Sequence, residues 1–241
     1  MSAAAAPLPD PLADLGGEAA VGRLDAFLRE RFPAIDGPIA LTPTAGGMSN
    51  PTFFVTAPGF AAVLRKRPAA VTVKSAHAID REYRVLCALP GSAVPVPAPI
   101  LYHDAADILD TPFYLMERLD GRVYNDCALP GLSPVERVAA YRSMAEVMAA
   151  MHRFDWQANG LADYGRPGNF FARQFKRWSE LWPLYRAEPI PDLDRLVAWL
   201  GERIPPSETL ALCHGDFRVA NLIFHPSEPR VIGILDWELS T

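Results

Sequence analysis

The stretch HGDFRVAN, residues 214–221, is followed fifteen residues later by Asp236 within ILDWE, residues 234–238. Phosphoryl transfer from ATP needs a group that accepts or orients a substrate hydroxyl proton, and it needs oxygen ligands for Mg²⁺. Asp216 has the place of such a base, and Asn221 and Asp236 supply the hard oxygen ligands that Mg²⁺ prefers. Arg218 lies two residues after the base, where a cation can reach a transferring phosphoryl group. The two segments therefore predict a site for phosphoryl transfer.

A structural interpretation of the same segments competes with this one. His-Gly-Asp would then be a polar turn between strands, and Asp236 an edge carboxylate. The position of the second aspartate, directly after an apolar run, weighs against that alternative. The sequence has no HExxH, GxSxG or GxxxxGK[ST] motif, which excludes the zinc hydrolase, serine hydrolase and P-loop classes. We expect His214 to support the loop.

The segments HGDFRVANLIFHP and VIGILDWE resemble the catalytic and metal segments of the aminoglycoside phosphotransferase/choline kinase family, which is distantly related to protein kinases. More narrowly, REYRVLCALPGSAVPVPAP, FYLMERLDGRVY and CHGDFRVANLIFHP are similar to the kinase-like domain associated with some acyl-CoA dehydrogenases. The resemblance covers roughly residues 20–241. It implies a bilobal protein-kinase-like fold, ATP and Mg²⁺ as cofactors, Asp216 as catalytic base, and Asn221 and Asp236 as Mg²⁺ ligands.

A glycine pair precedes the first strand of a predicted hairpin. Gly46 and Gly47, followed by Ser49 and Asn50, can fold over phosphates because glycine lets the backbone approach a ligand closely. Such a pair before a strand is more often only a turn, and it is not a GxGxxG motif. The HGD segment downstream favours nucleotide contact.

The apolar run ending in Arg65 and Lys66 is the predicted place of the cation that pairs with the α- and β-phosphates. In the V-A-I-K pattern of protein kinases, the residue two before the cation faces adenine. That register selects Arg65, with Val63 over the base, and strand alternation turns Lys66 to the other face. Lysine is usual here in the family, so the choice between Arg65 and Lys66 stays open. Glu82 is expected either to pair with this cation or to be a surface glutamate between two arginines.

Periodicity and turn signals predict an α+β protein of two lobes. Helices are expected over 18–32, 75–89, 133–152, 170–185 and 192–203, and strands over 52–56, 61–65 and 112–116, with short apolar segments at 209–213, 221–224 and 231–235. The helix at 133 should open with a capping box, Ser133 to Glu136. Met116 and Glu117 resemble the hinge of the kinase-like family, whose backbone would form hydrogen bonds with adenine.

Three parts of the chain follow from this pattern. We expect a disordered lead-in over 1–17, a nucleotide-binding N-lobe with a small antiparallel sheet over 18–118, and a mainly helical catalytic C-lobe over 119–241. Because kinases of this type continue past the metal aspartate with further helices, we expect the C-lobe to be C-terminally incomplete.

Composition excludes several other classes. Half of the residues are hydrophobic and 21% are charged, as in ordinary globular enzymes. The net charge of -5 gives no basic footprint for nucleic acid or a membrane surface. Three distant cysteines form no disulfide framework or zinc motif. With no signal-peptide pattern and no long apolar run, we expect a cytoplasmic protein.

The acceptor is the least readable part of the sequence. Residues 156–207 hold seven Lys/Arg and six Asp/Glu, with Arg173, Lys176 and Arg177 close together. A pocket for polycationic aminoglycosides should be acidic, so this balance favours an anionic acceptor such as a hydroxyacyl-CoA. An ordinary solvated helix face is the alternative. Two other functions stay open: a kinase-fold regulatory module without turnover, and a kinase for an aminoglycoside or choline-like acceptor.

Overall fold

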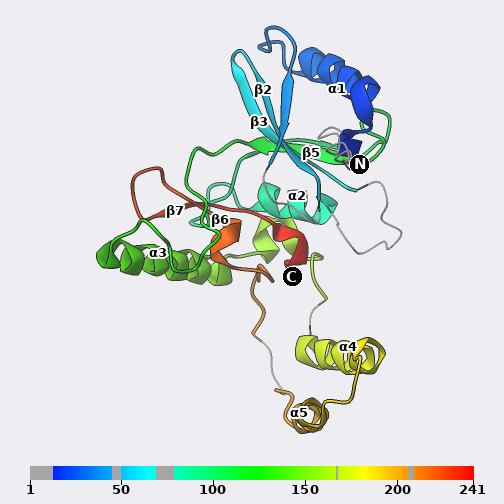
Figure 1. Cartoon of the computed structure of the whole chain (residues 1–241), viewed down its shortest axis with the longest axis vertical. Coiled ribbons are helices and arrows are strands. Elements are labelled where there is room, and N and C mark those ends of the chain that lie inside the picture. The colour runs from blue at the N-terminus through cyan, green and yellow to red at the C-terminus, as the bar shows by residue number, and fades with distance from the viewer. Residues whose placement is uncertain (1–12, 45–49, 69–78, 167, 206–208) are drawn as a thin grey trace, which may run out of the picture.

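The structure, a computed structural model, describes residues 13–44, 50–68, 79–166, 168–205 and 209–241. A five-stranded antiparallel sheet, ordered β1-β2-β3-β5-β4, lies above a mainly helical part of the chain (Figure 1). The strands are β1 (Ala40–Pro43), β2 (Thr52–Ala57), β3 (Phe60–Lys66), β4 (Pro99–His103) and β5 (Phe113–Glu117). Helix α1 (Gly17–Arg31) covers one face of this sheet and helix α2 (Ile79–Ala88) packs against the other.

The pleat of β3 separates two hydrophobic cores. Ala62 and Leu64 belong to the core that α1 completes with Leu24. Val63 points the other way, into the core that holds Tyr114 and the buried residues of α2. Because successive side chains of a strand face opposite sides of its sheet, this alternation fixes which residues of β3 can reach the lower part of the molecule.

Below the sheet lie helix α3 (Pro134–Arg153) and a two-stranded ribbon, β6 (Leu222–Phe224) and β7 (Val231–Ile234). Helix α3 opens with the predicted capping box: Ser133 Oγ accepts from the Glu136 N–H at 3.3 Å, and Glu136 Oε2 accepts from the Ser133 N–H at 2.8 Å. The Val231 N–H donates to Ser143 Oγ of α3 at 3.0 Å, which fixes the ribbon against this helix.

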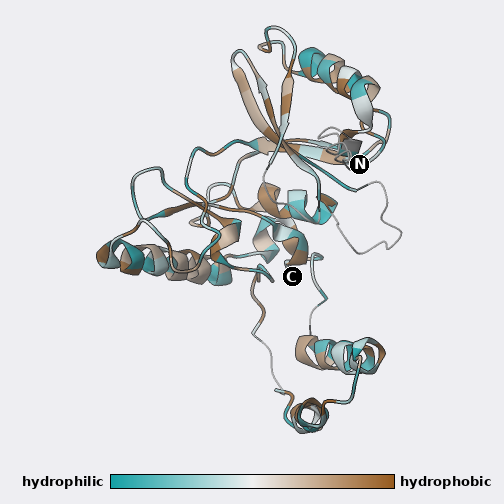
Figure 2. Cartoon of the chain, in the orientation of Figure 1, coloured by the Kyte–Doolittle hydropathy of each residue, from teal (hydrophilic) through white to brown (hydrophobic). Residues whose placement is uncertain are grey.

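Helices α4 (Phe170–Tyr185) and α5 (Pro191–Gly201) stand apart from the rest of the molecule and lie next to one another (Figure 1). Neither helix has a buried residue. Both carry hydrophobic and hydrophilic stretches (Figure 2). Their apolar side chains are therefore only partly covered, unlike those of α1 and α2.

Most of the predicted elements are confirmed, with boundaries shifted by one or two residues at several ends. The disordered lead-in is wrong for residues 13–17: η1 (Ala13–Leu15) precedes α1, and Leu15 is fully buried in the core under α1. Leu15 packs in the core under α1 and the backbone oxygen of Asp14 accepts from Lys66, two contacts that composition did not reveal. Residues 1–12 and the predicted cap Ser75 lie outside the described residues.

Two further differences concern strands. The segment 209–213 forms no strand, although Cys213 exchanges backbone hydrogen bonds with Thr241 at 2.8 and 2.9 Å. Strand β4 was not predicted, because the proline-rich segment before it is typical of a loop.

The division into lobes near residue 118 stays a prediction. Within the described ranges, no helix has the length and apolar character needed to cross a membrane.

Candidate active site

The loop that carries Asp216 turns sharply at Gly215. This glycine has φ of +85°, and a Cβ there would lie 2.3 Å from the carbonyl oxygen of Leu239. Only glycine combines this backbone conformation with so close an approach at little cost. The loop therefore rests directly on η4 (Trp237–Leu239), the short helix that follows Asp236.

His214 fixes the base of this loop. Its Nε2 lies 2.8 Å from the carbonyl oxygen of Leu235, and its Nδ1 accepts from the Asp216 N–H at 3.2 Å. These partners require a neutral ring that carries its proton on Nε2. Burial lowers the pKa of His214, although Asp216 and Asp236 act in the opposite sense. The imidazole joins the loop to the strand end before Asp236, in agreement with the expected supporting role.

The predicted catalytic group and its neighbours lie in direct contact. Asn221 Nδ2 donates to Asp216 Oδ2 and to the Asp216 backbone oxygen, both at 2.9 Å. Arg218 Nε lies 3.2 Å from the same Oδ2, and its side chain is 63% exposed. An amide and a mobile cation thus orient the carboxylate, as a general base requires.

The ribbon brings the two predicted metal ligands to one end. Leu222 pairs with Ile234, and the Leu235 N–H donates to the Asn221 carbonyl at 2.9 Å. Asn221 precedes β6 and Asp236 follows β7, so antiparallel pairing places both at the same end. Asp236 has φ of 66°, unusual for a residue with a side chain. One amide and one carboxylate are hard oxygen donors that fit Mg²⁺, which keeps several of its waters.

In the part of the chain that the structure describes, no group of three or more His, Cys, Asp or Glu side chains is arranged to hold a metal ion. The candidate site offers two oxygen donors, Asn221 and Asp236, and Mg²⁺ is usually bound through one or two protein ligands together with water.

Arg65 crosses from the sheet to this site. Its Nε lies 3.1 Å from Glu82 Oε2 of α2, and its Nη2 donates to Asp236 Oδ1 at 2.5 Å. The same Nη2 lies 3.7 Å from Glu238 Oε2. Glu82 also accepts from the Trp237 N–H at 3.2 Å, so α2, β3 and η4 meet at one cluster of charges.

Burial sets the protonation of this cluster. Burial by itself lowers the pKa of Arg65, but the carboxylates of Glu82 and Asp236 raise it by more, so Arg65 stays charged. Burial raises the pKa of Glu82, and Arg65 opposes that shift. Burial and the neighbouring Glu82 also raise the pKa of Tyr114 well above its usual value. One cation thus faces three carboxylates in a low-dielectric setting.

Lys66 does not reach the site. Its Nζ donates to the backbone oxygen of Asp14 at 2.5 Å, on the face of the sheet that α1 covers. Strand alternation between residues 65 and 66 is the reason. Of the two cations between which the sequence left the choice open, the structure brings Arg65 to the site and places Lys66 on the other face of the sheet. Three other predicted residues, Gly46, Gly47 and Ser49, lie outside the described residues.

The residues predicted to face adenine lie together on the lower face of the sheet. Val63 pairs with Met116 across β3 and β5 and with Phe54 across β2 and β3. The Glu117 N–H donates to the Ala98 oxygen at 2.8 Å, so a hinge contact through that N–H would have to replace an existing bond. The sequence did not identify Phe54, which the strand register places opposite Val63.

Two further residues, Arg118 and Glu238, were not predicted from the sequence. The guanidinium carbon of Arg118 lies 4.4 Å from the centre of the Phe54 ring, in a cation–π contact. Glu238 accepts from Asn50 Nδ2 at 3.0 Å, over 188 residues of sequence. The only hint in the sequence was that Glu238 is acidic and lies two positions after Asp236.

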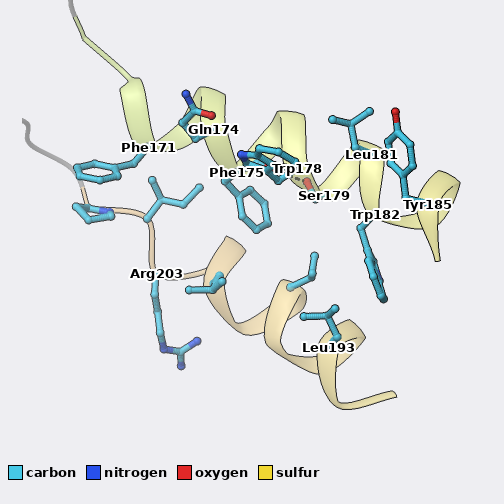
Figure 3. A pocket seen from close by; sticks show the side chains of 14 residues that line it. Phe171, Gln174, Phe175, Trp178, Ser179, Leu181, Trp182, Tyr185, Leu193 and Arg203 are labelled. Carbon is cyan, nitrogen blue, oxygen red and sulfur yellow. Dashed lines mark hydrogen bonds between the residues drawn. The ribbon is translucent and has the colours of Figure 1, made fainter. Parts of the chain in front are cut away.

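The predicted anion-binding cluster on α4 is mostly occupied by local contacts. Arg173 donates to the backbone oxygens of Arg166 and Gly168, and Arg177 lies over the Trp178 ring at 5.5 Å. Between α4 and α5 is a groove of about 610 Å³ with mainly apolar walls (Figure 3). Phe175 points into the space between the two helices, beside Gly201 (Figure 3).

Comparisons with known proteins agree with this geometry. Residues 40–241 match the model of a family described as the phosphotransferase enzyme family. Mouse acyl-CoA dehydrogenase family member 10 is 42% identical over 205 residues, which cover 85% of this chain and 19% of that protein. The chain spans less than a third of the length of the curated relatives that it matches.

Solved structures show the same fold. A protein from Ralstonia eutropha, provisionally described as an aminoglycoside phosphotransferase, has a TM-score of 0.80 and 44% identity, covering 91% of this chain and 65% of that one. A thermostable mutant of aminoglycoside phosphotransferase APH(4)-Ia, in ternary complex with AMP-PNP and hygromycin B, has a TM-score of 0.63 and 21% identity, covering 90% and 71%. At that identity the second likeness supports the α+β kinase-like fold alone.

Proposed function

The chain belongs to the phosphotransferase enzyme family, and we propose that it transfers the γ-phosphate of ATP to a hydroxyl group of a small molecule. One observation carries the proposal: Asp216, Asn221, Asp236 and Arg65 converge through direct contacts or shared backbone bonds. These are the groups that phosphoryl transfer requires, namely a base, two oxygen ligands and a cation. AMP-PNP in the APH(4)-Ia complex supports ATP as the donor.

In the proposed reaction, Asp216 accepts the proton of the acceptor hydroxyl as the oxygen attacks the γ-phosphorus, while the bond from that phosphorus to the bridging oxygen of the β-phosphate breaks and ADP leaves. Asn221 holds the Asp216 carboxylate in place through its amide. Arg218 is exposed enough to turn from Asp216 towards the transferring phosphoryl group, where its planar guanidinium can form two hydrogen bonds.

For the nucleotide, we propose that Asn221 and Asp236 hold Mg²⁺ and that Arg65, oriented by Glu82, binds the α- and β-phosphates. When bound, Mg²⁺ supplies charge neutralisation for the phosphate oxygens. The apolar face made by Phe54, Val63 and Met116 is the proposed contact for adenine.

For the acceptor, we propose a hydroxyacyl-CoA. The relative named as an acyl-CoA dehydrogenase family member supports this choice. A functional link with an acyl-CoA dehydrogenase follows from the same proposal. An aminoglycoside acceptor is the second candidate, favoured by the 44% identical protein of Ralstonia eutropha.

The test is release of ADP in the presence of Mg·ATP and panels of hydroxyacyl-CoAs, free hydroxy acids and aminoglycosides. We expect turnover with a hydroxyacyl-CoA, and loss of about 10²–10⁴ in rate for Asp216→Asn because the base is gone while the ligands stay. Glu180→Gln, an exposed change on α4, serves as the matched control. Nucleotide binding without turnover on any acceptor would instead support a regulatory module. Turnover on aminoglycosides alone would show that the acceptor is an aminoglycoside and not a hydroxyacyl-CoA.

A further inference from the structure

Glu238 lies close enough to Arg65 to affect the position of its guanidinium. The Nη2 atom of Arg65 is bonded to Asp236 Oδ1 at 2.5 Å and is 3.7 Å from Glu238 Oε2. Glu82 contacts a different atom of the guanidinium, Nε, at 3.1 Å. The guanidinium therefore lies between the two carboxylates of ILDWE on one side and Glu82 of α2 on the other, where Nε and Glu82 Oε2 form an ion pair without a hydrogen bond.

Asn50 holds Glu238 in this position. Its side chain is fully buried, and its Nδ2 donates to Glu238 Oε2 at 3.0 Å. A carboxylate only accepts, so the NH₂ side of the amide must face Glu238. Within the described ranges, Asn50 Oδ1 has no hydrogen-bond partner. The bond from Nδ2 therefore joins the segment before β2 to η4.

Binding of a metal ion by Asp236 conflicts with its bond to Arg65. Two cations on one carboxylate repel each other, so a metal ion on Asp236 weakens the contact between Arg65 and Asp236. Glu238 Oε2 is the nearby acceptor. The gap of 3.7 Å is about 1 Å longer than a charge-assisted hydrogen bond of about 2.7–2.9 Å. A small movement of the guanidinium, which stays paired with Glu82, closes it.

We propose that Glu238, held by Asn50, is a positioning residue that keeps Arg65 in the site when Asp236 takes up Mg²⁺ with its nucleotide. Arg65 pivots on Glu82, and its Nη2 exchanges Asp236 for Glu238. The guanidinium then stays next to the phosphates instead of following Asp236 or turning to solvent. This inference rests on the proposed function, because it assumes that Asp236 binds the metal.

Calorimetric titration with AMP-PNP, with Mg²⁺ and in EDTA, tests the exchange on the chain as it stands. Glu238→Gln keeps an oxygen for Asn50 but removes the charge that attracts Arg65. We expect its Kd for Mg·AMP-PNP to rise about tenfold, while its Kd in EDTA and its melting temperature change little. Asn50→Ala keeps every charge and removes the amide that holds Glu238, so it should weaken Mg·AMP-PNP binding too, and the double variant should lose less than the two single losses combined.

The outcomes separate this inference from the proposed function. If Asp236→Asn removes the Mg²⁺-dependent part of binding and Glu238→Gln binds like the wild type, the exchange is overturned and the proposed function stands. If the wild type binds equally with and without Mg²⁺, both fail. A loss with Glu238→Gln but none with Asn50→Ala would mean that net charge alone acts, and that result also overturns the exchange. Should Glu238→Gln fold poorly, Glu238→Asp, which withdraws the charge by one carbon, gives the same comparison.

Discussion

Residue 215 has room for a hydrogen atom and nothing larger. The Leu239 carbonyl oxygen occupies the space that a Cβ would need, and the positive φ adds strain for any other residue. The contact is backbone to backbone, so no side-chain rotation can relieve it. The geometry of the proposed base next to it depends on this approach.

Gly215→Ala should therefore lower the free energy of unfolding by about 3 kcal/mol or more, through clash and strain together. Gly91→Ala is the matched control, because Gly91 has nearly the same φ of +83° but nothing within 4 Å of the added carbon. It should cost only the strain, about 1–2 kcal/mol. Urea denaturation measures both, and equal losses would show that the Leu239 contact does not matter.

His214 gives the stability of the chain a defined pH dependence. Burial depresses its pKa in the folded state below the value of 6.5 expected in the unfolded chain. The unfolded state then binds the proton first as the pH falls. The stabilising contribution is complete above pH 6.5 and is lost as the pH falls through the folded pKa.

Free energies of unfolding between pH 5 and pH 8 test this direction. The wild type should lose stability below pH 6.5 with an extra slope of up to about 1.4 kcal/mol per pH unit relative to His214→Gln, which cannot titrate. The absolute stability of the variant does not matter, since the slopes are compared. Parallel curves for the two proteins would contradict a depressed pKa at this residue.

At the scale of elements, strand alternation decides the chemistry of β3. Arg65 and Lys66 are adjacent cations, yet one reaches Glu82 and Asp236 while the other reaches the backbone of Asp14. Each side chain stays on its own face because a slip of one residue would exchange all buried residues of the strand. The sheet register therefore selects the cation.

The N-terminal cap of helix α3 is a local sequence signal whose contribution to stability can be measured. Ser133→Ala removes the acceptor for the Glu136 N–H and should lower the free energy of unfolding by about 1 kcal/mol. Ser227→Ala, an exposed serine outside any helix or strand, is the control and should be nearly neutral. Thermal or urea unfolding of the two variants gives the comparison. A neutral Ser133→Ala would mean that tertiary packing alone fixes this end of α3.

At the scale of the whole molecule, helices α4 and α5 contribute differently from the rest. Neither has a buried residue, whereas the two cores on the faces of the sheet contain fully buried side chains. Apolar burial is the main stabilising contribution to a folded segment. The helix pair should therefore open more easily than the body of the molecule.

Native-state hydrogen exchange measures this difference. Amide groups of α4 and α5 should exchange through openings of lower free energy than those of α3, and Phe175→Ala should speed exchange in α4 and α5 only. Phe175 is the test residue because it lies against Gly201, where the two helices meet. Equal protection across α3, α4 and α5, or an effect of Phe175→Ala spread over all three, would show that the helix pair is part of the same cooperative unit.

Features that depend on neighbours along the chain could be predicted from the amino-acid sequence. The helix periodicity, the hairpin of β2 and β3, the cap at Ser133 and the spacing of Asp216, Asn221 and Asp236 all act over a few residues, or through one short ribbon. Local propensity and turn chemistry act over the same range, so these features were predictable.

Contacts between distant segments depended instead on how whole elements pack. Glu82 could be exposed or buried on sequence grounds, and packing of α2 under the sheet buries it against Arg65. Asn50 and Glu238 meet over 188 residues, and no local pattern encodes such a pair. The physical reason is that burial and long-range hydrogen bonds depend on how whole elements pack, which the two cores on either face of the sheet set for the entire chain.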